Sequence, residues 1–263
     1  MNRRSPIAAR SLALILIALA GIVAPSAHAT DDLHDAWDQL LGMYVIEGSD
    51  GVDRVDYDRL RAHADDRAAL VDYIASLEAQ PVSTLAPDAQ FALWANLYNA
   101  VTVRLIVEEN PSRSIMQIRP SLFSIGPWAA ERVTVEGRAL SLDDIEHGIM
   151  RPQFDAPLVH YAVNCASIGC PDIRTRAWRA DTLDEDLDAA ARAYVNHPRG
   201  VTVTDRGLVI SRIYKWYQED FGGNDAGVIA HLLAYAQPQL AQAIRANPRI
   251  AGHTYDWALN RPD

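Results

Sequence analysis

The sequence predicts an α+β domain in which a helical N-terminal half packs on a small, mainly antiparallel sheet. Three observations favour this class. Helical spacing dominates the first half, one long segment is apolar nearly all round, and two turns between apolar runs indicate hairpins in the second half. No repeat, low-complexity tract or linker divides residues 30–263, so we expect one domain.

Residues 1–29 are typical of a cleavable signal peptide. Three arginines precede an apolar run from Leu12 to Val23, and Ala27-His28-Ala29 has the small residues that a signal peptidase accepts. This run is too short to span about 30 Å of hydrocarbon. No cysteine follows it to carry a lipid anchor. We therefore expect a periplasmic or secreted protein with no stable membrane anchor after cleavage.

The charge of the predicted mature chain disfavours two classes of partner. Cleavage would remove three of the 24 basic residues and none of the 34 acidic ones, so the net charge would change from −10 to −13. Such a surface repels phosphate backbones and anionic lipids. Nucleic acid is therefore not an expected partner, whereas a peptide or protein of the cell envelope is compatible with the charge.

Helical spacing is predicted for three segments of the first half. Apolar residues recur at this spacing in two early groups, Leu33, Trp37, Leu40 and Leu41, and Ala69, Leu70, Tyr73, Ile74 and Leu77. Asp56-Tyr57-Asp58 lies between them as a polar connection or cap. The third helix runs from Asp88 to Glu108. It is apolar nearly all round, which predicts a central, buried position.

The second half is predicted to mix strands with short helices. Glu136-Gly137 and Asp205-Arg206-Gly207 each separate two apolar runs and predict hairpins. Ser141 to Asp144 has capping-box spacing and opens a helix to about Met150. We expect a buried strand at Leu158–Val163. A last helix is predicted from Ala226 to about Tyr235, with Asn224 or Asp225 as its cap and Pro238 as its limit.

The segment from His160 to Pro171 is the strongest candidate for chemistry. Here a predicted strand leads into a turn of small residues, a common place for functional side chains. Cys165 is a nucleophile candidate if a histidine accepts its proton. In a regular strand His160 and Asn164 share one face and Cys165 points to the other. His160 is thus the base only if the turn swings Cys165 round, and His147 is the second choice.

Two other interpretations of Cys165 and Cys170 are a disulfide and a metal site. In an oxidising compartment the two cysteines can form a disulfide that closes a tight loop. A zinc site of two cysteines and two histidines has no support from paired-ligand spacing elsewhere in the chain. We therefore expect no metal and no cofactor. The choice between free thiol and disulfide stays open at this point.

Further polar residues are candidates on three other segments. Asn96 and Asn99 share one face of the long apolar helix, where buried amides either tie down a neighbouring loop or line a pocket. Glu146 precedes His147 on the capped helix and either orients a histidine or belongs to a solvated face. An aromatic run leads to a Gly-Gly helix end and adds Trp216 as a ligand contact and Asp220 as an orienting acid.

Together these segments resemble the DUF547 family, a domain of unknown function in exported bacterial proteins and in plants. The resemblance runs from about Val52 to the C-terminus. It rests on five motifs: Trp94-x-Asn96-x-Tyr98-Asn99-Ala100, Ser141-Leu142-Asp143-Asp144-Ile145-Glu146-His147, His160-Tyr161-Ala162 with Cys165 and Cys170-Pro171, Ser211-x-Ile213-x-x-Trp216-Tyr217-x-x-Asp220-Phe221, and Tyr255-Asp256-Trp257-x-Leu259-Asn260.

The resemblance implies no settled activity. Plant members keep a cysteine at the position of Cys165 and carry serine at that of Cys170, which favours Cys165 as the functional thiol. The family is also distantly similar to papain-like and transglutaminase-like folds, an analogy of fold alone.

Two hypotheses follow from the sequence. In the first, the protein is a cysteine-dependent hydrolase or acyltransferase with Cys165 as nucleophile and His160 or His147 as base. Asn96 or Asn99 would then orient the base or stabilise an oxyanion, and Glu146, Asn164, Trp216 and Asp220 would surround the substrate. In the second, it is a non-enzymatic binding or scaffold domain of the cell envelope with a Cys165–Cys170 disulfide.

Overall fold

The computed structural model describes residues 32–121 and 126–262. The predicted signal peptide lies outside these residues, so its cleavage and the location of the protein stay predictions. Within the described ranges, no helix combines the length and apolar character needed to cross a membrane.

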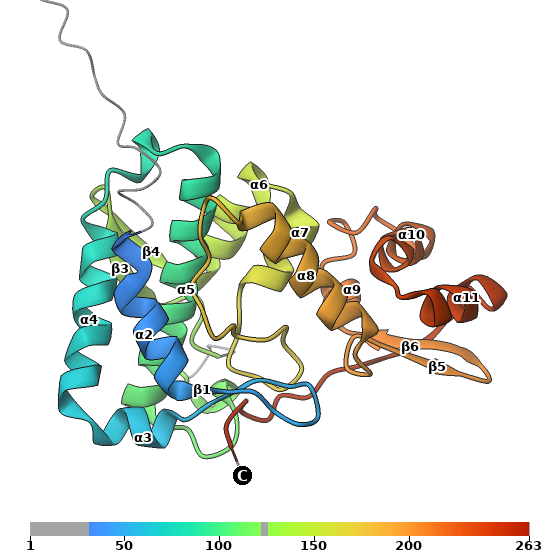
Figure 1. Cartoon of the computed structure of the whole chain (residues 1–263), viewed down its shortest axis with the longest axis horizontal. Coiled ribbons are helices and arrows are strands. Elements are labelled where there is room, and N and C mark those ends of the chain that lie inside the picture. The colour runs from blue at the N-terminus through green and yellow to red at the C-terminus, as the bar shows by residue number, and fades with distance from the viewer. Residues whose placement is uncertain (1–31, 122–125, 263) are drawn as a thin grey trace, which may run out of the picture.

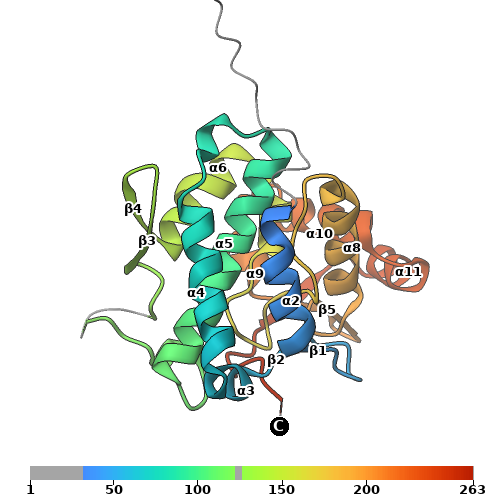
Figure 2. The same cartoon turned by 60° about the vertical axis from the view of Figure 1, so that its left-hand side comes forward.

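α-Helices build the first half of the molecule around the central helix α5 (Figure 1). They are α2 (Asp35–Tyr44), α3 (Tyr57–Ala62), α4 (Ala64–Glu78) and α5 (Pro87–Glu109). Figure 2 shows α2, α4 and α5 side by side. Short 3₁₀ turns accompany them: η1 (Asp32–His34), η2 (Val82–Thr84) and η3 (Ile115–Gln117). The predicted helices are therefore confirmed, and the Asp56 side chain caps α3 by accepting from the Arg59 amide.

The long helix α5 occupies the position that its composition predicted. Its side chains are buried on all faces between Ala89 and Val107, except at Gln90 and Arg104. α5 packs against α3, α4 and the π-helix η4 (Asp144–Met150). It ends where Asn110 adopts the left-handed conformation with a φ of 47°. Asn tolerates this conformation better than most residues.

Within residues 32–121 and 126–262 the strands form three small sheets, and the predicted α+β class is confirmed. β1 (Val45–Ile46) pairs with β2 (Arg54–Val55), and β3 (Glu131–Val135) pairs with β4 (Arg138–Ser141), both antiparallel. The third sheet has the order β5 (Val201–Thr204), β6 (Gly207–Ser211) and β7 (Ile250–Thr254). β7 joins β6 in parallel, whereas β5 and β6 are antiparallel.

Both predicted hairpins are present. In the second one, Thr204 pairs with Gly207, so the turn contains two residues and not the three expected. Gly207 has a φ of 124°, which confirms the need for glycine at this position.

Short helices fill the second half. They are α6 (Arg151–Gln153), α7 (Ala156–Ala162), α8 (Leu183–Asn196), α9 (Ile213–Trp216), α10 (Asp225–Tyr235) and α11 (Pro238–Ala246). The predicted helix at 226–235 is confirmed as α10, because the Asn224 side chain accepts from the Gly227 amide and caps it. The predicted limit at Pro238 also holds, since Pro238 begins the next helix.

The strand predicted at Leu158–Val163 is wrong, because these residues belong mainly to α7. An apolar run of this length has no periodicity that separates a buried strand from a buried helix. Pro157 is the overlooked signal, since it lies in the first turn of α7, where proline favours a helix start. His160 therefore projects from a helix, and the strand-face argument about its distance from Cys165 does not apply.

Two hydrophobic cores meet beside α7. The first surrounds α5 and the second surrounds Tyr194, Leu208 and Tyr214, and Leu158 of α7 packs against both. After β7 the chain returns to the first core, where Leu259 donates its amide to Arg113 and the Val55 amide donates to Asn260. Figure 1 shows this last segment running back beneath the N-terminal helices. The C-terminal segment thus links the two halves.

Candidate functional site

Asn96 and Asn99 hold loops in place through their buried side-chain amides. Asn96 donates to the Trp178 carbonyl at 2.8 Å and accepts from the Trp178 amide at 3.0 Å. Asn99 donates to the Ala162 carbonyl at 2.9 Å and accepts from the Asn164 amide at 2.8 Å. These bonds occupy the side-chain oxygen and nitrogen of both residues with backbone partners. The structure therefore gives them the loop-holding role and not the catalytic role that the first hypothesis assigned.

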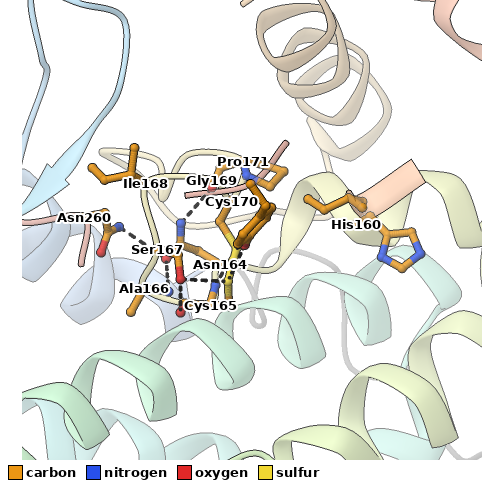
Figure 3. The surroundings of a disulfide bond; sticks show 12 residues. His160, Asn164, Cys165, Ala166, Ser167, Ile168, Gly169, Cys170, Pro171 and Asn260 are labelled. Carbon is orange, nitrogen blue, oxygen red and sulfur yellow. Dashed lines mark hydrogen bonds between the residues drawn. A yellow bond between two sulfur atoms is a disulfide. The ribbon is translucent and has the colours of Figure 1, made fainter. Parts of the chain in front are cut away.

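Asn164 also shapes the chain and does not line the site. Its amide nitrogen donates to the Pro171 carbonyl at 2.7 Å, and its oxygen accepts from the Ala166 amide at 2.8 Å (Figure 3). This second bond forms across a turn in which Ala166 has a φ of 57°. A left-handed non-glycine residue is strained and needs such local support. Asn164, predicted as a ligand contact, is not among the residues that line the pocket described below.

Cys165 and Cys170 form a disulfide, as the second hypothesis expects (Figure 3). These are both of the cysteines in the sequence. The Tyr255 hydroxyl lies 3.0 Å from the Cys165 sulfur and donates to the Cys170 sulfur at 3.3 Å. Gly169 in the loop approaches the Asp256 backbone so closely that a Cβ there would lie 2.9 Å from it. The C-terminal segment thus covers the disulfide loop.

His160 lies between two carboxylates. Its Nε2 is 2.6 Å from Asp220 Oδ2, and its Nδ1 is 3.5 Å from Glu146 Oε1. Its ring stacks on Tyr217 with centroids 4.2 Å apart. Burial opposes a charge on this imidazole, but hydrogen bonds to Asp220 and Glu146 outweigh burial and raise the pKa of His160.

The carboxylates around His160 are held ionised in turn. Arg151 forms a fork on Asp220, with Nε 2.6 Å from Oδ2 and Nη2 2.9 Å from Oδ1. Burial raises the pKa of Asp220, but the bonds from His160 and Arg151 outweigh it and the pKa is lowered. Burial likewise opposes the charge of Glu146, and hydrogen bonds from His160 and Tyr98 help to lower its pKa.

The predicted pair of Cys165 and His160 is therefore not formed. Both imidazole nitrogens face carboxylates, so neither is directed at the Cys165 sulfur. Figure 3 shows the His160 ring turned away from the disulfide. Asp220 does orient a histidine as expected, but the histidine is part of a charged network.

Glu146 and His147 lie on the π-helix η4, in an unusually wide helical turn. The predicted capping box is present, since the Ser141 amide donates to Asp144 Oδ2 at 2.9 Å and Ser141 Oγ accepts from the Asp144 amide. The helix that follows has π geometry from Asp144 to Met150, where an α-helix was expected. Single π turns are rare and frequently occur at functional sites. The wide turn brings Glu146 to the buried side and leaves His147 half-exposed.

These elements enclose a pocket of about 310 Å³ at the junction of the two cores. This volume is at the lower end of small-molecule sites, which are on the order of 300–1,000 Å³. The predicted residues Glu146, His147, His160, Cys165 and Trp216 all line it. Asp220 supports the wall through His160. The structure thus brings together most of the predicted site, but not Asn96, Asn99 and Asn164.

The aromatic side of the pocket was mostly missed by sequence reasoning. Its rings come from six residues: Tyr98, Trp128, Trp216, Tyr217, Tyr255 and Trp257. Tyr255 and Trp257 belong to the C-terminal motif of the family resemblance, which could have marked them. Trp128 lies in a loop and carried no signal. Asp143, which also lines the pocket, was noted only as part of the capping sequence.

No group of three or more His, Cys, Asp or Glu residues in the described ranges is arranged to hold a metal ion. The polar and aromatic groups that line the pocket are the six rings, the carboxylates of Asp143 and Glu146, and the imidazoles of His147 and His160.

Comparison with known proteins returned one family. The family model described as "Protein of unknown function, DUF547" matches residues 82–195. This match contains the long helix, the π-helix and the disulfide loop. The motifs around Trp216 and Tyr255, which also resemble the family, lie outside the matched residues. No curated protein and no solved structure matches the chain.

Proposed function

We propose, from the pocket and from the match of residues 82–195 to the DUF547 family of unknown function, that the protein is an exported, non-enzymatic ligand-binding domain of the cell envelope. In this proposal the Cys165–Cys170 disulfide is a permanent part of the pocket wall. The ligand is a small molecule, or the end of a cell-envelope peptide or protein.

The observation that carries the proposal is the chemical state of the site. The Cys165 sulfur is bonded to Cys170 and is not available as a nucleophile. His160, the first candidate base, has both ring nitrogens directed at carboxylates, which raise its pKa. The pocket is nevertheless well formed, with an aromatic side, a carboxylate side and supporting hydrogen bonds. A concave, largely aromatic pocket with a few placed polar groups is the usual form of a ligand site.

Export is supported by the N-terminal sequence and by the disulfide together. Residues 1–29 have the charge, apolar run and small residues of a signal peptide. Disulfides form and persist in oxidising compartments and are rare in the cytosol. The acidic net charge favours peptides, proteins or small molecules over nucleic acid as partners.

Thiol labelling of the full chain after native export tests the proposal. We expect no cysteine to react with a thiol-directed electrophile before reduction, and two to react after reduction and denaturation. A Cys165→Ser/Cys170→Ser variant serves as the unlabelled control. A free, reactive Cys165 thiol in the natively exported protein would overturn the proposal.

One observation favours a second candidate, a cysteine-dependent hydrolase or acyltransferase that acts in the reduced form. The Cys165 sulfur lines the pocket beside the Tyr255 hydroxyl, so a freed thiolate would face a bound ligand. It would attack an acyl carbonyl and form a thioester as the leaving group departs with a proton. Water or an acceptor would then release the acyl group. Because His160 is engaged, His147 is the remaining base candidate of the two that the sequence suggested.

The single variant Cys170→Ala separates the two candidates, because it frees Cys165. For the second candidate we expect rapid labelling of Cys165 at neutral pH, through a thiolate, and a large loss of this rate in Cys170→Ala/His147→Gln. Labelling no faster than that of an ordinary exposed thiol would remove the second candidate and leave the binding function as proposed.

A further inference from the structure

We infer that the pocket binds an organic cation, such as an alkylammonium group, between its aromatic rings and the carboxylate of Asp143. The inference rests on the proposed function, because it names the class of ligand that the same pocket takes.

The aromatic side of the pocket forms a cluster of tilted rings. The Trp257 ring centroid lies 4.6 Å from that of Tyr255, 5.5 Å from that of Trp216 and 5.9 Å from that of Trp128. The angles between these ring planes range from 35° to 56°. A sugar ring prefers a flat aromatic platform, whereas tilted rings present several faces and edges to one compact group. The negative faces of such rings attract a cation through their quadrupoles.

The fixed cations of the site are already paired. Arg151 forks onto Asp220, and His160 lies between Asp220 and Glu146. Arg151 also covers the Tyr217 ring at 4.9 Å, so Tyr217 already has a cationic partner. The site therefore has three carboxylates and two basic side chains that pair with them. The carboxylates are Asp220, Glu146 and Asp143, and the basic groups are Arg151 and His160.

Asp143 is the carboxylate without a close cation. Its nearest basic partner is His147, with Nε2 3.8 Å from Oδ1, too far for a hydrogen bond. The Asp143 side chain is 46 % exposed and lines the pocket. Its backbone amide donates to the Trp128 carbonyl at 3.1 Å, which ties the Asp143 backbone to the loop that carries one ring of the aromatic side.

The surroundings of Asp143 disfavour its negative charge, which a bound cation would stabilise. Burial raises the pKa of its carboxyl, His147 offsets part of this, and the Glu146 and Asp144 carboxylates add to it. A bound cation would compensate this charge directly. An anion would instead face Asp143 and Glu146, and it would find Arg151 and His160 occupied. The pocket therefore selects against anions.

Choline and its uncharged isostere 3,3-dimethylbutan-1-ol provide a direct test. They have nearly the same shape and differ in the charge of the quaternary centre. Both compounds are titrated into the mature, oxidised protein and followed by NMR. We expect choline to shift the indole signals of Trp128, Trp216 and Trp257. The affinity for choline should be about tenfold higher than for the alcohol, within the range of a cation–π contact with a partly desolvated carboxylate.

Asp143→Asn and a matched control sharpen the test. Asn keeps the shape of the side chain and removes its charge, so we expect roughly a tenfold loss of choline affinity. The weak affinity for the alcohol should not change. Asp205→Asn removes an exposed charge from the turn between β5 and β6 and should leave both affinities unaltered.

Two results would overturn the inference. Equal binding of choline and the alcohol would show that the pocket recognises shape without charge, and the binding function would survive. Absence of shifts at the indole signals with both probes would exclude a cation site. In that case the thiol labelling described above decides separately whether the proposed function also fails.

Discussion

His160 and His231 both contact the ring of Phe221, but their surroundings differ. The His160 and His231 ring centroids lie 5.5 Å and 4.8 Å from that of Phe221. His160 faces two carboxylates, and its pKa is raised despite burial. His231 hydrogen-bonds the Tyr161 hydroxyl at 2.7 Å. Burial, with a contribution from the positive His160, lowers the pKa of His231 to about 4.

The difference shows that neighbouring groups decide the charge of a buried histidine. His160 is buried and His231 is partly buried, yet the pKa is raised only at the histidine that has anionic partners. Phe221 thus separates a charged pocket wall from a neutral core of hydrogen-bonded tyrosines, such as Tyr161 and Tyr214 with hydroxyls 3.2 Å apart. Burial of charge on the pocket side agrees with the ligand-binding function proposed for this pocket.

Asp220→Ala is expected to have the largest effect on the charged wall. It leaves His160 and Arg151 without their shared carboxylate. Breaking a buried ion pair in this way costs about 3–5 kcal/mol of unfolding free energy, measurable by urea denaturation. Glu219→Ala is the matched control, because this exposed neighbour should change stability by less than about 0.5 kcal/mol. Equal effects of the two variants would show that the network does not hold His160.

His231→Phe is expected to change the pH dependence of stability. Between pH 6.5 and about 4 the unfolded chain binds a proton at His231 that the folded protein does not, so stability falls as the pH falls. The loss is roughly 2–3 kcal/mol across this window. The variant should lack the contribution of His231 to the pH dependence of stability. The contribution of His34, whose pKa is also lowered to about 4, should remain. Parallel slopes of variant and wild type in denaturation between pH 4 and 7 would contradict this assignment.

For His160 we expect the opposite pH dependence, in which stability falls as the pH rises above 6.5. Because its folded pKa is raised, its contribution is fully present below pH 6.5 and is lost as the pH rises through the folded pKa. Wild type should therefore lose stability at alkaline pH relative to His160→Gln, which offers a direct comparison with His231→Phe.

Cys165→Ser/Cys170→Ser should cost about 2 kcal/mol, since a short loop closes little of the unfolded chain. Denaturation of wild type with and without reductant provides the control, and reduction should reproduce the effect of the variant. The pH slope of His231 should not change, because the disulfide belongs to the pocket side. A changed slope would mean that the two regions are not separate.

Trp216→Ala is expected to have the smallest effect on stability, within about 0.5 kcal/mol, because the side chain is 43 % exposed. Choline binding should nevertheless weaken. Trp37→Ala is the contrasting variant, since Trp37 is buried in the first core and its loss should cost about 3–5 kcal/mol. A stability loss at Trp216 close to that at Trp37 would mean that Trp216 is a core residue.

Local signals in the sequence were sufficient for much of the fold. The α5 helix, the hairpins and the Asn224 cap follow from spacing, turn residues and capping chemistry within a few positions. α7 was mistaken for a strand because its short apolar run has no distinctive period. The π geometry after Ser141 was not predictable either, since the capping box specifies where a helix begins and not how wide its turns are.

The sequence predicted most of the residues that form the candidate site, but it did not predict which of them contact one another. Cys165, His160, Glu146, His147 and Trp216 do meet in one pocket. The sequence left the disulfide open, however, and it paired His160 with the wrong group, because Asp220 is 60 positions away. Tyr255 is 90 positions from Cys165. Contacts of this separation depend on how α7 and β7 are placed, which local patterns do not determine.

The return of the chain after β7 makes the pocket depend on residues outside the family match. A chain that ended at residue 195, where the match ends, would contain the cysteine loop and His160. It would lack Asp220, which hydrogen-bonds that histidine, and Tyr255, which covers the sulfurs. The wall of the pocket is therefore complete only when residues 255–257 lie beside the disulfide loop.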